Sequence, residues 1–123
     1  MKSISSHVLD ALAGSDAGGI KVSCHRLNAD GSRRLLLESK ADASGRITIE
    51  VNTEDDDEHT RYELVFSCQD YFRSNASGPL AELHSPISDA VFRLDLTGVK
   101  DRVHAPIIIA PHGHSTWWSH AGR

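Results

Sequence analysis

The sequence has few of the features that mark specialised protein classes. Its 123 residues include only two cysteines, Cys24 and Cys68, which argues against a small secreted scaffold built on disulfides. No run of apolar residues is long enough to span a bilayer, and the first residues contain no apolar core of signal-peptide length. We therefore expect a cytoplasmic protein that does not bind membranes.

The charges are nearly balanced over most of the chain. Thirteen Lys and Arg residues stand against seventeen Asp and Glu residues, and five of these acids form one run at residues 54–58. No basic cluster could follow a nucleic-acid backbone, so we expect no nucleic-acid partner. The acidic run lacks the glycine and the spaced ligands of a calcium loop, and we interpret it as a solvated hairpin loop without function.

Short segments of alternating apolar and polar residues are the commonest local pattern. Residues 46–51 show it clearly, because Ile47, Ile49 and Val51 would share one face of a half-buried strand. We expect further strands at residues 4–10, 20–27, 33–39, 62–68, 90–96 and 103–109, and a short one near Ser115. Turn signals separate them, and only residues 69–74 could form a brief helix. The chain therefore predicts a single domain, residues 1–123, folded as an all-β antiparallel sandwich of seven to eight strands with one short helix.

Three histidines near the end of the chain could carry chemistry. In the strand expected at residues 103–109, period-two geometry places His104 opposite the apolar residues, so it need not be a core histidine. His112 and His114 would share a face if that segment is extended, and three converging histidines could hold a zinc ion. Their spacing matches no known zinc signature, and we expect neither a metal site nor a cofactor.

Arginine and tryptophan side chains could also contact a small ligand. Arg46 follows a turn glycine and begins a strand, where its guanidinium could be held rigidly against a carbonyl or carboxylate, or remain solvated. Trp117 and Trp118 would lie on opposite faces of an extended tail, so at least one should pack against the body or a neighbouring subunit. Ser115 lacks the flanking glycines of a nucleophile elbow, which argues against an acyl-enzyme.

Five short sequence blocks occur in collinear order along the chain. They are His-Val-Leu-Asp at 7–10, Asp-x-x-Gly-Arg at 42–46, Tyr-x-Leu-x-Phe at 62–66, Tyr-Phe at 71–72 and a C-terminal block at 102–116. Each block is weak alone, but together they resemble the transthyretin-like family, in particular its 5-hydroxyisourate hydrolases. The resemblance implies a transthyretin-like sandwich that assembles as a homotetramer, with active sites in a channel where dimers meet.

The same resemblance implies a catalytic role for His7, Arg46 and His104. One histidine would help to activate water as a general base, and the other would hydrogen-bond and orient the substrate. Arg46 would stabilise charge on the opening ring. The reaction would open a cyclic amide of 5-hydroxyisourate, a product of purine degradation.

The C-terminal tail departs from that family. The enzymes end in Tyr-Arg-Gly-Ser, whereas this chain has Trp-Trp-Ser-His at 117–120, followed by three more residues. Two indoles and a histidine would make the channel mouth more apolar and add a titratable group. We expect five residues of this region to contact the substrate: His114, Ser115, Trp117, Trp118 and His120.

Three functions remain open on these observations. The first is hydrolysis of 5-hydroxyisourate or a close cyclic ureide. The second is recruitment of the same residues to cyclisation, isomerisation or ring opening of another aromatic or alkaloid-like metabolite. The third is non-catalytic binding of a planar ligand or a partner protein, anchored by the tryptophans. Because His7, Arg46 and His104 are all present, and the hormone carriers of this fold lack that set, the sequence favours an enzyme acting on a small molecule.

Overall fold

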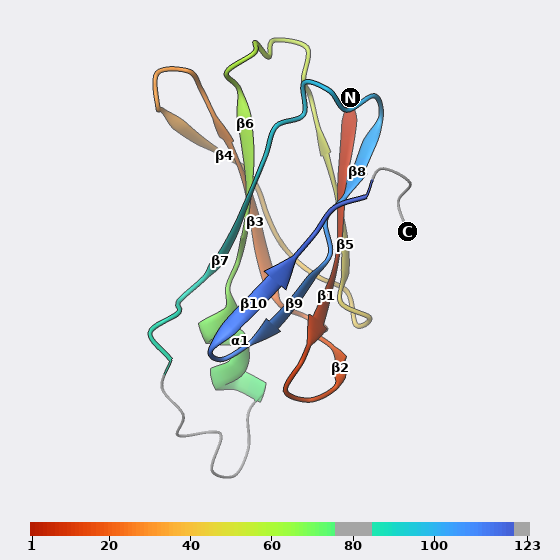
Figure 1. Ribbon diagram of the computed structural model, residues 1–123, viewed down its shortest axis with the longest axis vertical. Coiled ribbons are helices and arrows are strands. Elements are labelled where there is room, and N and C mark those ends of the chain that lie inside the picture. Colours follow the sequence, from red (N-terminus) through yellow and green to blue (C-terminus); the bar gives the residue numbers. More distant parts are fainter. Residues whose placement is uncertain (76–84, 120–123) are drawn as a thin grey trace.

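The protein consists of two facing β-sheets and one short helix in the computed structural model (Figure 1). The structure describes residues 1–75 and 85–119. In chain order, its elements are β1 (Lys2–Asp10), β2 (Ser15–Asp16), β3 (Lys21–Leu27), β4 (Arg33–Lys40), β5 (Arg46–Val51), β6 (Arg61–Phe66), α1 (Cys68–Asn75), β7 (Ala90–Leu94), β8 (Arg102–His104), β9 (Ile107–Ala110) and β10 (Gly113–Thr116). Within the described ranges, no helix has the length and apolarity needed to cross a membrane.

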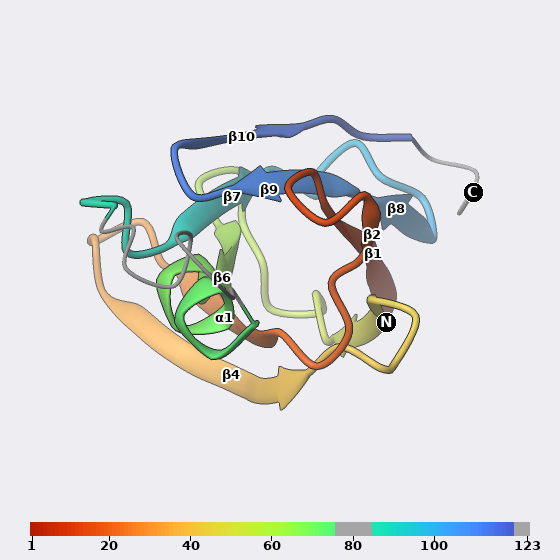
Figure 2. The ribbon, with the colours of Figure 1, turned by 90° about the horizontal axis from the view of Figure 1, so that it is seen from below.

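Strand β1 organises the larger, six-stranded sheet. It pairs antiparallel with β5 on one side, and parallel with β8 and then β9 on the other. β10 pairs with β9 at the outer edge, and the two residues of β2 pair with the end of β1. The smaller sheet has four antiparallel strands in the order β4-β3-β6-β7. Figure 2, seen from the helix end, shows β9 and β10 on one side of the interior and β4 on the opposite side.

Alternating side chains build the core between the sheets. In β1, residues 4, 6, 8 and 10 are buried, whereas residues 3, 5, 7 and 9 face outward and are only partly covered. Both sheets contribute to a single apolar cluster, whose largest fully buried members include Ile4, Ile49, Tyr62, Leu64 and Phe66. Burying one large apolar side chain stabilises a fold by about 1.5–3 kcal/mol. The same alternation leaves the outward positions of β1 available for polar residues.

A buried carboxylate connects the end of β1 to the helix. Asp10 is only 5% exposed, and its Oδ1 accepts hydrogen bonds of 2.9 Å from the backbone amides of Leu12 and Ala13. Its Oδ2 accepts one of 2.8 Å from the Tyr71 hydroxyl on α1. Gly14, with a φ of 70°, lets the chain reverse into β2. The β1–β2 hairpin is thereby held in a defined position.

The predicted transthyretin-like all-β sandwich is confirmed, with four corrections. The sheet around β1 is not wholly antiparallel, because its pairs with β8 and β9 are parallel. The strand expected at residues 103–109 is interrupted at Ala105 and Pro106, since proline has no amide hydrogen for the ladder. This break and the short β2 give ten strands in the described ranges instead of seven or eight. The strand expected to reach Cys68 ends at Phe66, and Cys68 begins α1.

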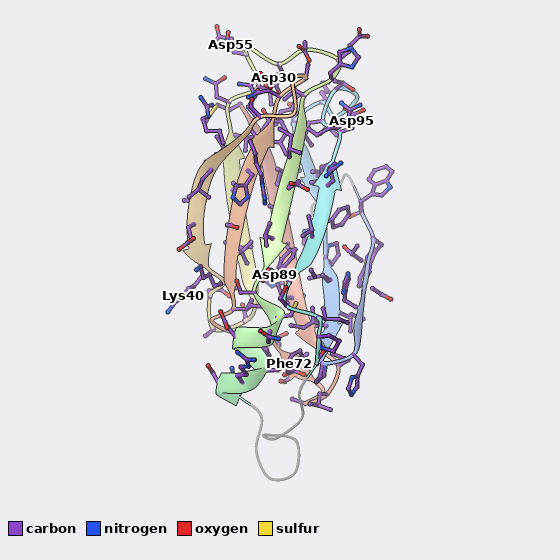
Figure 3. All side chains as sticks on the ribbon, turned by 90° about the vertical axis from the view of Figure 1, so that its left-hand side faces the viewer. Asp30, Lys40, Asp55, Phe72, Asp89 and Asp95 are labelled. Atoms are coloured by element: carbon purple, nitrogen blue, oxygen red, sulfur yellow. The ribbon has the colours of Figure 1, made fainter. Side chains whose placement is uncertain are left out.

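The acidic run at residues 54–58 is exposed at four of its five residues, as predicted, but it is not a hairpin loop. It connects β5 in one sheet to β6 in the other, so the strands it joins do not pair. The Asp56 side chain is 12% exposed, lies 3.1 Å from Arg26 and accepts a 2.6 Å hydrogen bond from Tyr62. Burial and this carboxylate raise the pKa of Tyr62. Figure 3 shows Asp55 of this run at the end of the sandwich opposite to Phe72 of α1.

Candidate active site

The outer face of the larger sheet brings the three predicted catalytic residues together. His7 on β1 lies directly opposite Arg46 in the β1–β5 pair. His104 on β8 lies opposite Ser5 in the parallel β1–β8 pair. Because alternate side chains of a strand point to one face, Ser5 and His7 both face away from the core. The three residues therefore occupy one face of the neighbouring strands β5, β1 and β8, which lie side by side in Figure 1.

A pocket of about 270 Å³ opens on this face. The polar residues that line it are Ser3, Ser5, Ser6, Arg46, Thr48, Arg102 and His104. Two of them carry a guanidinium, and no acidic residue occurs among the described residues of its lining. A guanidinium presents a planar set of donors to a carbonyl or a carboxylate. The pocket thus suits a small ligand with carbonyl groups or negative charge.

His104 faces outward as the period-two geometry predicted, but it is covered. Only 4% of it is exposed. Its backbone exchanges hydrogen bonds with Ser119, so the tail runs along this part of β8. Burial, followed by the charges of Arg46 and His7, lowers the pKa of His104. The ring is therefore neutral at neutral pH and has a lone pair that can accept a proton.

Ser5 determines which nitrogen of His104 is available. The Ser5 Oγ atom lies 2.8 Å from Nδ1 of His104. The Ser5 backbone carbonyl raises the His104 pKa, in opposition to burial, which is the effect expected of an acceptor close to an N–H of the ring. We assign the proton to Nδ1 because an N–H there can donate to the Ser5 hydroxyl oxygen at 2.8 Å. Nε2 then carries the lone pair.

The turn before β5 places Arg46. Oδ1 of Asp42 accepts 2.9 Å hydrogen bonds from the backbone amides of Ser44 and Arg46, and one of 2.8 Å from the Ser44 hydroxyl. These hydrogen bonds hold the pKa of Asp42 below its usual range, and the bond from the Arg46 amide has the largest effect. Gly45 has a φ of 76°, and a Cβ there would lie 2.5 Å from the carbonyl oxygen of Val8. The Asp-x-x-Gly part of the block therefore positions Arg46 and does not itself face the pocket.

His7 has a carboxylate partner that the sequence analysis did not identify. Its Nε2 lies 2.8 Å from Oδ1 of Asp16, the second residue of β2. The His7 side chain is 21% exposed and the Asp16 side chain is 45% exposed. His7 does not line the pocket, but it is close enough for its charge to lower the pKa of His104. No local pattern signals this contact, because the hairpin turn separates the two residues.

The ladder between β9 and β10 continues into the tail. Ser115 pairs with Ile108, and Ser119 pairs with His104, so the two pairs share one register. Because side chains alternate, Ser115, Trp117 and Ser119 lie on the face that carries His104. The Trp117 side of the tail thus borders the candidate site, and its indole is 45% exposed.

The other tail residues expected to bind substrate lie elsewhere. His114 pairs with Ile109, whose side chain faces the core, so His114 is on the opposite face from Ser115. Trp118 has the same orientation and lines a pocket of about 790 Å³ together with Val103 at the edge of the sandwich. His120 lies outside the described residues. Ser115 and Trp117 thus share the face of His104, but none of the described tail residues lines the pocket that contains His104 and Arg46.

The three histidines considered for zinc do not converge. His112 is exposed in the turn before β10, and His114 does not share a face with His104. In residues 1–75 and 85–119, no three His, Cys, Asp or Glu side chains form a group that could hold a metal ion.

Comparisons with known proteins match the whole sandwich. A 5-hydroxyisourate hydrolase of Halalkalibacterium halodurans is 31% identical over 114 residues, which cover 93% of this chain and 94% of that protein. The structure of Klebsiella pneumoniae 5-hydroxyisourate hydrolase superposes with a TM-score of 0.73 at 28% identity, over 97% of this chain and 99% of that one. Sea bream transthyretin, solved in complex with thyroxine, has a TM-score of 0.74 at 19% identity over 94% of this chain and 93% of that one, a likeness of fold. Residues 4–118 match the HIUase/Transthyretin family, and the chain belongs to that family.

Proposed function

We propose that this protein is an enzyme that hydrolyses 5-hydroxyisourate or a closely related cyclic ureide. The observation that carries this proposal is the placement of His7, Arg46 and His104 on one outer face, around or beside a single polar pocket. Relatives named 5-hydroxyisourate hydrolase support the same activity.

His104 has the properties of the general base in this reaction. Its lowered pKa keeps Nε2 unprotonated, so that nitrogen can take a proton from water as the water oxygen attacks a ring carbonyl. The new C–O bond places negative charge on the carbonyl oxygen, and the Arg46 guanidinium stabilises that charge. When the C–N bond of the ring breaks, the protonated His104 returns its proton to the leaving nitrogen. His7 then has the second role, which is to hydrogen-bond and orient the substrate.

The charge of the pocket agrees with this chemistry. Hydrolysis of a cyclic amide produces a carboxylate, and both Arg46 and Arg102 line the pocket. We further propose that the active sites lie in a channel between the dimers of a homotetramer, as in the resemblance drawn above. Sedimentation of the purified protein tests the assembly, and a monomeric active enzyme would contradict it.

One observation favours a second candidate function. The Trp117 indole is exposed on the face of His104, where a larger planar substrate could stack on it. In this alternative the same three residues catalyse cyclisation, isomerisation or ring opening of another aromatic or alkaloid-like metabolite.

Variants of the proposed base and guanidinium test the proposal. His104→Ala and Arg46→Ala should each abolish the acceleration of 5-hydroxyisourate decay while the protein stays folded. His25→Ala and Arg34→Ala are the matched controls, because both residues lie on strands of the other sheet. Full turnover by His104→Ala and Arg46→Ala would contradict the mechanism.

A further inference from the structure

We infer that Asp16 is a positioning residue that fixes the proton of His7 on Nε2, so that His7 presents an unprotonated Nδ1 to a hydrogen-bond donor of the substrate. This inference deepens the proposed function and rests on it. It assigns a role to a residue outside the three predicted catalytic side chains, and it defines one chemical feature that the substrate must have.

The contact between the two side chains sets the tautomer. His7 Nε2 and Asp16 Oδ1 are 2.8 Å apart. An ionised carboxylate can accept hydrogen bonds but cannot donate them. A neutral His7 ring must therefore carry its proton on Nε2 to make this bond, and its lone pair is then on Nδ1.

The backbone holds Asp16 in place although its side chain is partly exposed. Asp16 is paired with Leu9 across the β1–β2 hairpin. The hairpin also contacts the turn that carries Arg46, because the Gly45 carbonyl accepts a 2.8 Å hydrogen bond from the Val8 amide. A Cβ on Gly45 would lie 3.5 Å from the Cβ of Asp16, so the two turns are in close contact. The carboxylate and the guanidinium are thus placed by one packed unit.

The two histidines consequently present different ring nitrogens. Ser5 occupies Nδ1 of His104, and Asp16 occupies Nε2 of His7. His104 therefore offers Nε2, and His7 offers Nδ1. Both of these nitrogens carry a lone pair. Of the two histidines, only His104 lines the pocket beside Arg46, where the substrate carbonyl would be attacked. His7 is then placed to accept a hydrogen bond from the same substrate molecule.

This arrangement specifies the substrate class. The substrate must carry a hydrogen-bond donor, such as a ring N–H or a hydroxyl, in addition to the carbonyl that reacts. A site with an unpaired acceptor discriminates against analogues that lack the matching donor. Cyclic ureides with free N–H groups meet the requirement, whereas analogues alkylated at that nitrogen do not.

The experiment compares Asp16→Asn with wild type by two independent readouts. In ¹⁵N-histidine-labelled wild-type protein at pH 8.5, the His7 resonances, assigned by their absence in His7→Gln, should report a proton on Nε2. The Asn amide can donate to Nε2, so Asp16→Asn should shift the proton towards Nδ1. Its kcat/KM for 5-hydroxyisourate should fall about tenfold, the size expected when one neutral hydrogen bond to the substrate is lost.

Two controls separate positioning from folding. Ser15→Ala changes the other residue of β2 and should leave both readouts as in wild type. Asp16→Glu retains a carboxylate and should retain the Nε2 proton and most of the activity. A merely structural role of Asp16 would lower the melting temperature without moving the tautomer.

The outcomes distinguish this inference from the proposed function. A wild-type His7 proton on Nδ1, or an Asp16→Asn protein with wild-type tautomer and activity, would overturn the role of Asp16. A wild-type protein that does not accelerate 5-hydroxyisourate decay would contradict the proposed function instead. The tautomer measurement needs no substrate, so it decides the role of Asp16 in that case as well.

Discussion

The Ser5 hydroxyl lies 2.8 Å from Nδ1 of His104, across the parallel pair of β1 and β8. The parallel pairing makes this contact possible, because it places Ser5 of β1 directly opposite His104 of β8, the proposed general base. Since Ser5 occupies one ring nitrogen, proton transfer in the pocket is left to Nε2.

Removal of this hydroxyl should slow the reaction without unfolding the protein. Ser5→Ala should lower kcat about 2- to 12-fold, which corresponds to the about 0.5–1.5 kcal/mol of one neutral hydrogen bond. The measurement is kcat for 5-hydroxyisourate, with Ser39→Ala on β4 of the other sheet as the control. An unchanged kcat in Ser5→Ala would show that the hydroxyl does not orient the base.

The lowered pKa of His104 predicts the sign of the pH dependence. The base must be neutral to act, and burial, Arg46 and His7 all favour the neutral ring. The rate should therefore remain on its plateau at the ordinary histidine pKa of about 6.5 and fall only at lower pH. The measurement is kcat/KM between about pH 5 and 8, corrected for spontaneous decay. The same profile is measured in His7→Gln, because His7 must also be neutral to accept a hydrogen bond from the substrate. An acidic limb at or above about pH 6.5 that persists in His7→Gln would contradict the assignment of His104 as the base.

The two tryptophans should differ in their effect on substrate binding. Trp117 shares the face of His104, whereas Trp118 lines the pocket at the edge of the sandwich. Trp117→Ala should raise KM about 3- to 10-fold through the loss of stacking on an aromatic ring, and Trp118→Ala should leave KM within about twofold. Steady-state kinetics of both variants make the comparison. A larger effect of Trp118→Ala would refute the register derived for the tail.

Gly45 should tolerate alanine less well than another glycine of the same backbone conformation. Gly45 and Gly31 have φ angles of 76° and 85°, so both substitutions incur about 1–2 kcal/mol of backbone strain. Only at Gly45 would the new Cβ press against a backbone atom, the Val8 oxygen at 2.5 Å, because the space at Gly31 is open. Urea unfolding should show a greater loss of stability for Gly45→Ala than for Gly31→Ala. Equal losses would show that the turn relaxes at no further cost.

Local sequence patterns predict the proposed catalytic residues but not the side chains that orient them. Alternation along the chain was enough to place His104 on the outer face, and the turn before Arg46 was visible as Asp-x-x-Gly. The partners Ser5 and Asp16 could not be found in this way, because their contacts depend on strand pairing and on a hairpin turn. Pairing partners are properties of the whole sheet.

Two predictions from the sequence needed correction, for different physical reasons. Residues 103–109 were predicted to form one strand, because a single proline does not alter the alternation of the apolar residues around it. The structure has two strands there. The acidic run was predicted to be a solvated hairpin loop. Four of its acids are exposed, but the run joins strands of different sheets, and Asp56 contacts Arg26 and Tyr62. The strand break follows from the local chemistry of Pro106, whereas the contact of Asp56 with Arg26 joins segments that are distant in sequence.

The most direct test of the account is the ultraviolet decay of freshly generated 5-hydroxyisourate with and without the purified protein. We predict an acceleration over the spontaneous rate that disappears in His104→Ala and persists in His25→Ala. If the folded wild-type protein leaves the spontaneous rate unchanged, the central claim fails, and the substrate must be sought among larger, more aromatic ring compounds.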